Sequence, residues 1–197
     1  MFSLLYGFWN LFFRRAEFQV LILGVDRAGK TTLLEQLKRL YTGLDPLPPG
    51  KIPPTVGLNI GRMQVERCKL IFWDLGGTPA LRSLWENYYS EAHGLIFVVD
   101  TSDHDRFEEA RDTLQLLLNH PDLAAIPLLV FANKQDVEGA TTPRELEAMF
   151  GLKQLLSSSQ PQNMLGTTAL NGDGVQEGIE WLVEALRKSP RAMGMQQ

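Results

Sequence analysis

Apolar strand patterns alternate with amphipathic helix patterns along most of this chain. The strand patterns are short apolar runs at residues 18–23, 94–100 and 126–132, with a shorter last strand at 164–169. The helix patterns repeat apolar side chains at i, i+3, i+4 and i+7, and they cover residues 33–41, 80–89, 107–118, 142–150 and 175–187. This alternation predicts a doubly wound α/β fold, with a mostly parallel sheet and helices on both faces.

One pair of segments breaks the alternation. Residues 56–65 alternate apolar and polar side chains, and residues 69–74 form a second strand-like run after only three intervening residues. So short a connection predicts an antiparallel hairpin. The expected sheet therefore has six strands, with one antiparallel strand at its edge. The segment before the hairpin, 42–54, is rich in proline and glycine and should be an exposed connection.

The first fifteen residues form a separate amphipathic segment. The apolar part, 2–13, is too short to cross a bilayer, which takes about 20 apolar residues. Its arginines follow the apolar stretch, whereas a secretory signal has its positive charge first. We expect a helix at a membrane interface, with two alternatives open: permanent packing on the domain, or release in one state only. Phe2 excludes N-myristoylation.

Composition limits the number of domains, the class of partner and the use of disulfides. The 197 residues suffice for one domain at 16–188, preceded by the helix at 1–15 and followed by a flexible tail at 189–197. Nineteen Lys and Arg residues against 23 Asp and Glu residues give a net charge of −4, so no basic field favours nucleic acid as a partner. Cys68 is the only cysteine, which excludes an intrachain disulfide, and we expect its thiol to be packed in a strand.

Between the first strand and the first helix lies GVDRAGKTT, residues 24–32, which fits the pattern of a phosphate-binding loop. Gly24 and Gly29 let successive backbone N–H groups face an anion, and the following helix adds the positive end of its dipole. Lys30 supplies a cation for the outer phosphates and Thr31 a hydroxyl for Mg²⁺.

Three strand ends carry polar residues where a ligand of such a sheet would bind. Asp74 begins DLGG and can reach Mg²⁺ through water. Asp136, in NKQD, can accept hydrogen bonds from N1–H and the exocyclic amine of guanine, which adenine does not offer. Thr168 and Ala169 place a backbone N–H near the base carbonyl. Guanine recognition disfavours a P-loop kinase or ATPase.

Taken together, these motifs resemble those of small GTPases of the ADP-ribosylation-factor (Arf/Arl) family. The resemblance covers about residues 2–187 and includes PTVGLN (54–59), WDLGG (73–77), FANKQD (131–136) and GVQEGIEWL (174–182). Within the family, the bulky Phe2, the long loop before Thr55 and SLWENYY (83–89) are most similar to the Arf-related branch of the trans-Golgi.

The resemblance implies a P-loop NTPase fold and a GDP/GTP switch with Mg²⁺. Thr55 would close over Mg²⁺ and the γ-phosphate, and the Gly77 amide would contact that phosphate. The implied nucleotide contacts are Gly24, Asp26, Ala28, Gly29, Lys30, Thr31, Thr32, Thr55, Gly77, Asn133, Lys134, Asp136, Thr168 and Ala169. Metal ligands would be Thr31, Thr55 and, through water, Asp74. Catalysis would involve Lys30, Thr55, Gly77 and, weakly, Thr78.

The resemblance also implies partners: an exchange factor, a GTPase-activating protein and effectors. The hairpin would slide by two residues on GTP binding and expel the N-terminal helix onto a membrane. Leu58, Trp73 and Tyr88 match the apolar triad shown to effectors, although Trp73 could instead belong to the core. If the family pattern holds, an acetylated N-terminus is read by an integral Golgi membrane protein. The expected location is the cytosol and the cytoplasmic face of the Golgi and trans-Golgi membrane.

Two positions depart from the family pattern. Thr78-Pro79 stands where a water-orienting glutamine is usual, so we expect slow intrinsic hydrolysis; the alternative is a GTP-bound adaptor that essentially never hydrolyses. Arg27 stands inside the phosphate loop, where relatives carry a small or neutral residue. It could assist near the β- and γ-phosphates, but solvent exposure is the favoured interpretation.

Overall fold

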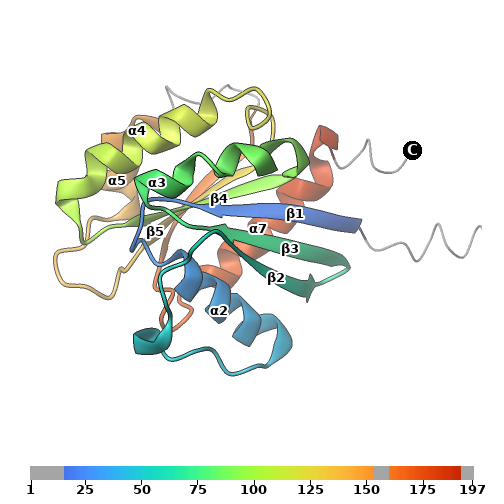
Figure 1. Cartoon of the computed structure of the whole chain (residues 1–197), viewed down its shortest axis with the longest axis horizontal. Helices are drawn as coiled ribbons and strands as arrows, with labels where there is room; N and C mark the ends of the chain where they lie inside the picture. The colour runs from blue at the N-terminus through green and yellow to red at the C-terminus, as the bar shows by residue number, and fades with distance from the viewer. Residues whose placement is uncertain (1–15, 153–159, 192–197) are drawn as a thin grey trace, which may run out of the picture.

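The computed structural model describes residues 16–152 and 160–191, and within them it contains one six-stranded sheet (Figure 1). Along the sheet the strands follow the order β2-β3-β1-β4-β5-β6. Their bounds are β1 Ala16–Leu23, β2 Leu58–Val65, β3 Cys68–Leu75, β4 Gly94–Asp100, β5 Leu128–Asn133 and β6 Gln162–Thr167. Only the β2–β3 pair is antiparallel, and the other pairs are parallel. The predicted hairpin, edge strand and sheet type are therefore confirmed.

Helices cover both faces of the sheet. They are α2 Lys30–Thr42, α3 Pro79–Arg82, α4 Phe107–Leu118, α5 Pro143–Phe150 and α7 Val175–Lys188, with short 3-10 segments η1 Pro49–Lys51, η2 Trp85–Glu91 and η3 His104–Arg106. Figure 1 shows α3 and α4 on one side of the strands and α2 on the other, where α2 also contacts α7. Thr142 caps α5 through the capping box that the sequence predicts.

The central strands form the core because helices cover them on both faces. Every residue of β4 and β5 is buried, which explains their nearly continuous apolar sequences. Phe97 and Phe131 are fully buried, and Gly178 of α7 lies directly against the Phe131 ring. A methyl group on Gly178 would come within 2.4 Å of that ring. The sheet and α7 therefore pack closely enough to need glycine at this position.

One predicted helix is wrong in its form. Residues 80–89 are divided between α3 and η2, because the backbone after Arg82 uses i to i+3 hydrogen bonds, as in Leu84 N to Leu81 O. The buried Trp85 indole also donates to Gly76 O, 2.9 Å away, which fixes this tighter path.

Most predicted strand boundaries are also shifted by one or two residues, and two of these shifts have a clear physical reason. Strand β5 begins at Leu128, after Pro127, whose nitrogen has no hydrogen to donate to a ladder. Strand β6 ends at Thr167, because Thr168 turns back to bridge Asp173. The predicted packing of the Cys68 thiol is confirmed, since Cys68 is 2% exposed.

The predicted N-terminal helix at 1–15 lies outside the described residues, as do residues 153–159 and 192–197. Among the helices within the described ranges, none has the length and apolar content needed to cross a bilayer. Of the predicted tail, Ser189 is buried and the Arg191 guanidinium donates to the carbonyl oxygens of Tyr89, Ala92 and Asp122. These first tail residues are thus held against the domain.

Candidate functional site

The phosphate-binding loop connects β1 to α2, as the sequence predicts, and its glycines are sterically required. A Cβ atom on Gly24 would lie 2.3 Å from Val98 O, and one on Gly29 would lie 2.3 Å from Asn133 Nδ2. Gly29 also has φ +98°, which side chains rarely adopt. The loop therefore packs tightly on β4 and β5 and directs the first N–H groups of α2 toward one cavity.

Lys30 begins α2, and its side chain is 6% exposed. Its ammonium group donates to Gly24 O at 3.0 Å and to Val25 O at 2.8 Å. Burial lowers the pKa of Lys30 to about 8, although the Asp74 and Asp26 carboxylates oppose this shift. A Cβ on Gly77 would lie 2.5 Å from Lys30 Nζ, so the end of the DLGG segment touches the lysine tip.

The Thr31, Thr55 and Asp74 side chains meet at one point. The two threonine Oγ1 atoms lie 2.7 Å apart, and both hydroxyls lie within hydrogen-bonding distance of Asp74 Oδ2, at 2.8 Å from Thr31 and 3.3 Å from Thr55. Burial raises the pKa of Asp74, and hydrogen bonds from the hydroxyls partly offset this rise. Among the described residues, Asp74 Oδ1 is buried without a hydrogen-bond partner.

This oxygen cluster fits a magnesium ion. Mg²⁺ prefers oxygen ligands and is bound by one or two carboxylates together with substrate phosphates, rather than by an all-protein cage. Across the described ranges, no group of three His, Cys, Asp or Glu side chains could hold a metal by itself. The unpaired Oδ1 of Asp74 leaves an acceptor for a metal-bound water.

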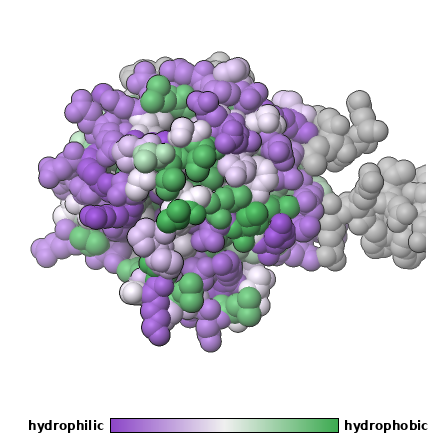
Figure 2. All heavy atoms as spheres, in the orientation of Figure 1, coloured by the Kyte–Doolittle hydropathy of each residue, from purple (hydrophilic) through white to green (hydrophobic). Residues whose placement is uncertain are grey.

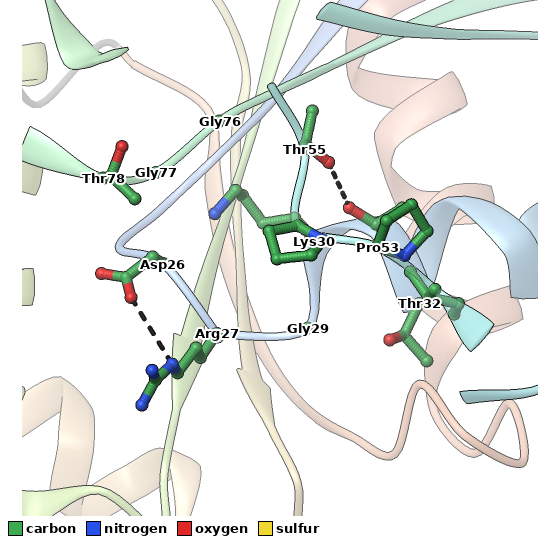
Figure 3. A pocket seen from close by; sticks show the side chains of 13 residues that line it. Asp26, Arg27, Gly29, Lys30, Thr32, Pro53, Thr55, Gly76, Gly77 and Thr78 are labelled. Atoms are coloured by element: carbon green, nitrogen blue, oxygen red, sulfur yellow. Dashed lines mark hydrogen bonds and ion pairs between the residues drawn. The ribbon is translucent and has the colours of Figure 1, made fainter. Parts of the chain in front are cut away.

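A cavity of about 370 Å³ opens between the phosphate-binding loop, residues 52–55 and residues 76–78 (Figure 3). Its lining includes Thr32 and Thr78, so Thr78 borders the same cavity as the phosphate-binding loop. Arg27 lines the rim, but its side chain is 87% exposed and lies 3.9 Å from Asp26. Figure 3 shows the guanidinium directed away from Lys30, which supports the solvent-exposed interpretation of Arg27.

At the predicted base end of the site, Asn133 organises the backbone. Its buried Nδ2 donates to Ala28 O at 2.8 Å, and its Oδ1 accepts from Ala169 N at 3.0 Å. Asn133 thus joins the phosphate-binding loop to the end of β6 and brings Thr168 and Ala169 beside it. The structure therefore assembles three segments that the sequence predicts to act together.

Asp136 and Lys134 have different surroundings. Asp136 is exposed, and within the described residues its carboxylate has no hydrogen bond or ion pair, so it can accept from a ligand. Lys134 has φ +68°, and its ammonium group lies 2.5 Å from Asp100 Oδ2. Burial opposes ionisation of Asp100, but hydrogen bonds from Lys134 and Ser102 outweigh it and lower the Asp100 pKa. Sequence reasoning missed Asp100, although its place at the end of a buried strand is a usable signal.

Arg106 is a second residue that sequence reasoning missed. It belongs to η3, and its guanidinium donates to Asp26 Oδ1 at 2.9 Å and to Asp26 O at 2.5 Å. Its Nε also contacts Asp103 Oδ2 at 2.8 Å. Arg106 therefore holds the phosphate-binding loop in place although it lies 80 residues further along the chain, and no local sequence pattern predicts this contact.

The predicted effector triad is only partly at the surface. Trp73 is 9% exposed, and its ring packs edge-on to Tyr88 with centroids 5.4 Å apart. Its cross-strand neighbour Ile60 is 41% exposed, and Leu84 is 39% exposed. Figure 2 shows apolar side chains near the centre of the face where Figure 1 draws β2 and β3. Leu58 and Tyr88 are half-buried, so Ile60 and Leu84 supply apolar surface that the sequence did not single out.

Comparisons with known proteins agree with this geometry. The model of the ADP-ribosylation factor family matches residues 5–186. ADP-ribosylation factor-related protein 1 of Rattus norvegicus, and likewise that of Homo sapiens, is 41% identical over 187 residues, covering 94% of this chain and 93% of the relative. ADP-ribosylation factor-like protein 3 of Saccharomyces cerevisiae is 38% identical over 197 residues, covering 98% and 97%.

A solved structure is similar over most of the domain. It is the Arl6 BBS3 small GTPase of Trypanosoma brucei with the bound nucleotide analogue GppNp, with a TM-score of 0.77 and 36% identity. The match covers 88% of this chain and 99% of that one. The loops, strand ends and glycines described above thus belong to a P-loop GTPase fold, and the chain is a member of the ADP-ribosylation factor family.

Proposed function

We propose that this protein is a GDP/GTP switch that recruits effectors to the cytoplasmic face of Golgi membranes and hydrolyses GTP slowly. The observation that carries the switch is the meeting of Thr31, Thr55 and Asp74. Thr55 ends a long exposed connection, and its hydroxyl faces the expected metal position. A ligand that holds Mg²⁺ beside a third phosphate would therefore order this connection, and loss of that phosphate would release it.

Within this proposal each residue has a distinct task. Lys30 and the N–H groups of the phosphate-binding loop hold the phosphates, and Gly77 presents its amide to the terminal one. Thr31, Thr55 and water on Asp74 would ligate Mg²⁺, which when bound neutralises charge on the phosphate oxygens. Asp136 accepts from the guanine edge. The Ala169 backbone amide already donates to Asn133, and this bond fixes the loop that borders the base.

Slow hydrolysis follows from the side chain at position 78. A threonine hydroxyl is shorter than a glutamine amide, and Pro79 begins α3 immediately after it, so the loop has little freedom to bring a longer group to the attacking water. A GTPase-activating partner would supply the group that orients the attacking water, which this loop lacks. The second candidate function, a GTP-bound adaptor, rests on the same Thr78-Pro79 sequence.

Hydrolysis and nucleotide exchange, measured together on the purified protein, test the proposal. We expect GTP-analogue and GDP complexes that interconvert, slow single-turnover hydrolysis, and faster hydrolysis in Thr78→Gln. Hydrolysis as fast as in a glutamine-bearing relative, or a Thr78→Gln variant without effect, would remove the assigned role of Thr78. No hydrolysis even with a family GTPase-activating protein would favour the adaptor.

The membrane part of the proposal rests on residues 1–15 and on the family relatives. Flotation with vesicles containing phosphatidylserine tests it, with GDP in one arm and a non-hydrolysable GTP analogue in the other. We expect binding mainly with the analogue, and no binding of a variant that lacks residues 1–15. Equal binding in both nucleotide states would contradict coupled release of the helix. Distribution of the tagged protein between Golgi and other membranes tests the location.

A further inference from the structure

Two successive peptide groups after β3 are held by side chains that follow them in sequence. Trp85 Nε1 donates to Gly76 O at 2.9 Å, and Arg82 Nε donates to Gly77 O at 2.9 Å. The C=O and N–H of a trans peptide point in opposite directions, and none of the described peptides is cis. Trp85 therefore fixes the direction of the Gly77 N–H, and Arg82 fixes that of the Thr78 N–H.

The bond to Gly77 O is one of three hydrogen bonds that the Arg82 guanidinium donates. Its Nη1 donates to Thr113 Oγ1 at 3.1 Å, and its Nη2 forms an ion pair with Glu109. Thr113 uses its own hydrogen to donate to Glu109 O at 2.7 Å, so its oxygen is free to accept from Arg82. Three acceptors in these directions match the planar fork of a guanidinium, which a lysine ammonium cannot reproduce.

Helix α4, which carries Glu109 and Thr113, is itself fixed relative to the phosphate-binding loop. The preceding η3 supplies Arg106, which holds Asp26 through both its carboxylate and its carbonyl. Gly77 in turn lies against that loop, since an added Cβ would fall 2.4 Å from Gly24 O and 2.6 Å from Asp26 N. Arg82 thus ties the Gly77–Thr78 peptide to a support that keeps its place beside the phosphates.

The Gly76-Gly77 pair needs such external support because glycine has more backbone freedom than any other residue. We propose that Arg82 is a positioning residue for the third phosphate: by fixing the Gly77–Thr78 peptide, it keeps Gly77 at the place where its N–H, oriented by Trp85, would contact the phosphate that distinguishes a nucleoside triphosphate from a diphosphate. This inference rests on the proposed GDP/GTP switch. Arg82 does not line the cavity and acts only through the backbone that it orients.

Dissociation rates of fluorescent GDP and of a fluorescent non-hydrolysable GTP analogue, measured on the full chain, test the inference. In Arg82→Ala we expect the GTP analogue to dissociate about tenfold faster, because charge-assisted hydrogen bonds that order its contacts are lost. GDP has no third phosphate, so its dissociation should change by less than about twofold on the same reasoning.

Three further variants define the mechanism. Arg82→Lys keeps the charge without the fork and should resemble Arg82→Ala. Glu109→Gln keeps an acceptor and should show a smaller acceleration with the same selectivity for the GTP analogue. Arg111→Ala is the matched control, because Arg111 lies on α4 and, among the described residues, its guanidinium forms hydrogen bonds and an ion pair only with its neighbour Asp112; it should change neither rate.

Equal acceleration of GDP and GTP-analogue release in the Arg82 variants would overturn the inference, since it indicates general loosening of the domain. Unchanged rates in all of them would overturn it as well. If Arg82→Ala does not fold, Glu109→Gln, at a site 35% exposed, decides between these outcomes. Failure of the proposed switch looks different, because the unmodified protein would then bind no guanine nucleotide or would release both at the same rate.

Discussion

The Oγ1 atoms of Thr31 and Thr55 lie 2.7 Å apart, although the two residues are 24 positions apart in the chain. Thr31 is fixed in the first turn of α2, whereas Thr55 ends a connection whose residues 47–51 are exposed. In the described structure, the side-chain hydrogen bonds of Thr55 are those to Thr31 and Asp74. The end of this connection at Thr55 is therefore held by the same oxygen cluster that fits Mg²⁺.

Replacing Thr55 tests that dependence. In Thr55→Ala we expect more Mg²⁺ to be needed to slow release of a GTP analogue, since one oxygen ligand is lost. Release of GDP should depend on Mg²⁺ almost as before. Thr42→Ala is the control, because the Thr42 hydroxyl lies at the exposed end of α2, where it donates to Lys38 O and accepts from Leu44 N. An equal shift for GDP would contradict a role of Thr55 beside the third phosphate.

Arg27 should be dispensable for chemistry. Its side chain is 87% exposed and directed away from Lys30, so Arg27→Ala should leave nucleotide release and hydrolysis unchanged. Its φ of +64° is strained for any residue with a side chain, so Arg27→Gly should raise the free energy of unfolding by about 1 kcal/mol. Urea denaturation measures this change. Slower hydrolysis in Arg27→Ala would instead place the guanidinium at the phosphates.

At Gly178, the packing of α7 should reverse the usual stabilisation of a helix by a glycine-to-alanine substitution. Alanine normally stabilises a helix by about 1 kcal/mol relative to glycine. In Gly178→Ala, however, the new methyl group would meet the Phe131 ring at 2.4 Å, and such overpacking costs about 1–3 kcal/mol. We expect a lower melting temperature. Gln176→Ala on the exposed face of α7 is the control, and stabilisation by Gly178→Ala would show that α7 packs less closely.

His93 should make folding sensitive to acid. Its Nδ1 accepts from Gln19 N at 3.1 Å, and burial, with a smaller effect of the Arg191 charge, lowers its pKa below the ordinary 6.5. The unfolded chain then binds a proton below pH 6.5 that the folded chain binds only at lower pH, so stability falls as pH falls through this window.

The His93→Asn variant isolates this effect, because asparagine keeps an acceptor for the Gln19 N–H but does not titrate. Urea denaturation at pH 7.5 and 5.5 should show a smaller loss of stability on acidification in the variant than in the unmodified protein. Identical pH dependence of the two proteins would show that His93 is not the group responsible.

Local patterns were sufficient to predict most of the fold. The strand at 94–100 and the helix at 107–118 appear with the predicted bounds. A strand that is buried on both faces is apolar throughout, whereas a helix that is buried on one face repeats its apolar side chains every three or four residues, so the sequence distinguishes the two. The helix at 80–89 was wrong because its path depends on the Trp85 indole reaching Gly76, a contact that periodicity does not encode.

The candidate site also contains residues that the sequence predicts and residues that it does not. Glycines, Lys30 and Asn133 were predictable because each belongs to a short motif with a fixed spacing. Arg106 and Arg82 were not, since each acts through a tertiary hydrogen bond to a loop that only the folded chain brings near. For Trp73 the sequence left two interpretations open, the effector surface and the core, and β3 places its side chain mostly inside.

The most direct test of the central claim is competition for the nucleotide site. Purified protein loaded with fluorescent GDP is titrated with GDP, GTP, ATP and xanthosine diphosphate, and the titration is repeated with Asp136→Asn. We expect the unmodified protein to release the label to GDP and GTP only. Asp136→Asn should prefer xanthosine diphosphate, because an amide can donate to the C2 carbonyl that replaces the guanine amine. Displacement by ATP as strong as by GTP, or an unaltered preference in Asp136→Asn, would contradict a guanine-nucleotide switch.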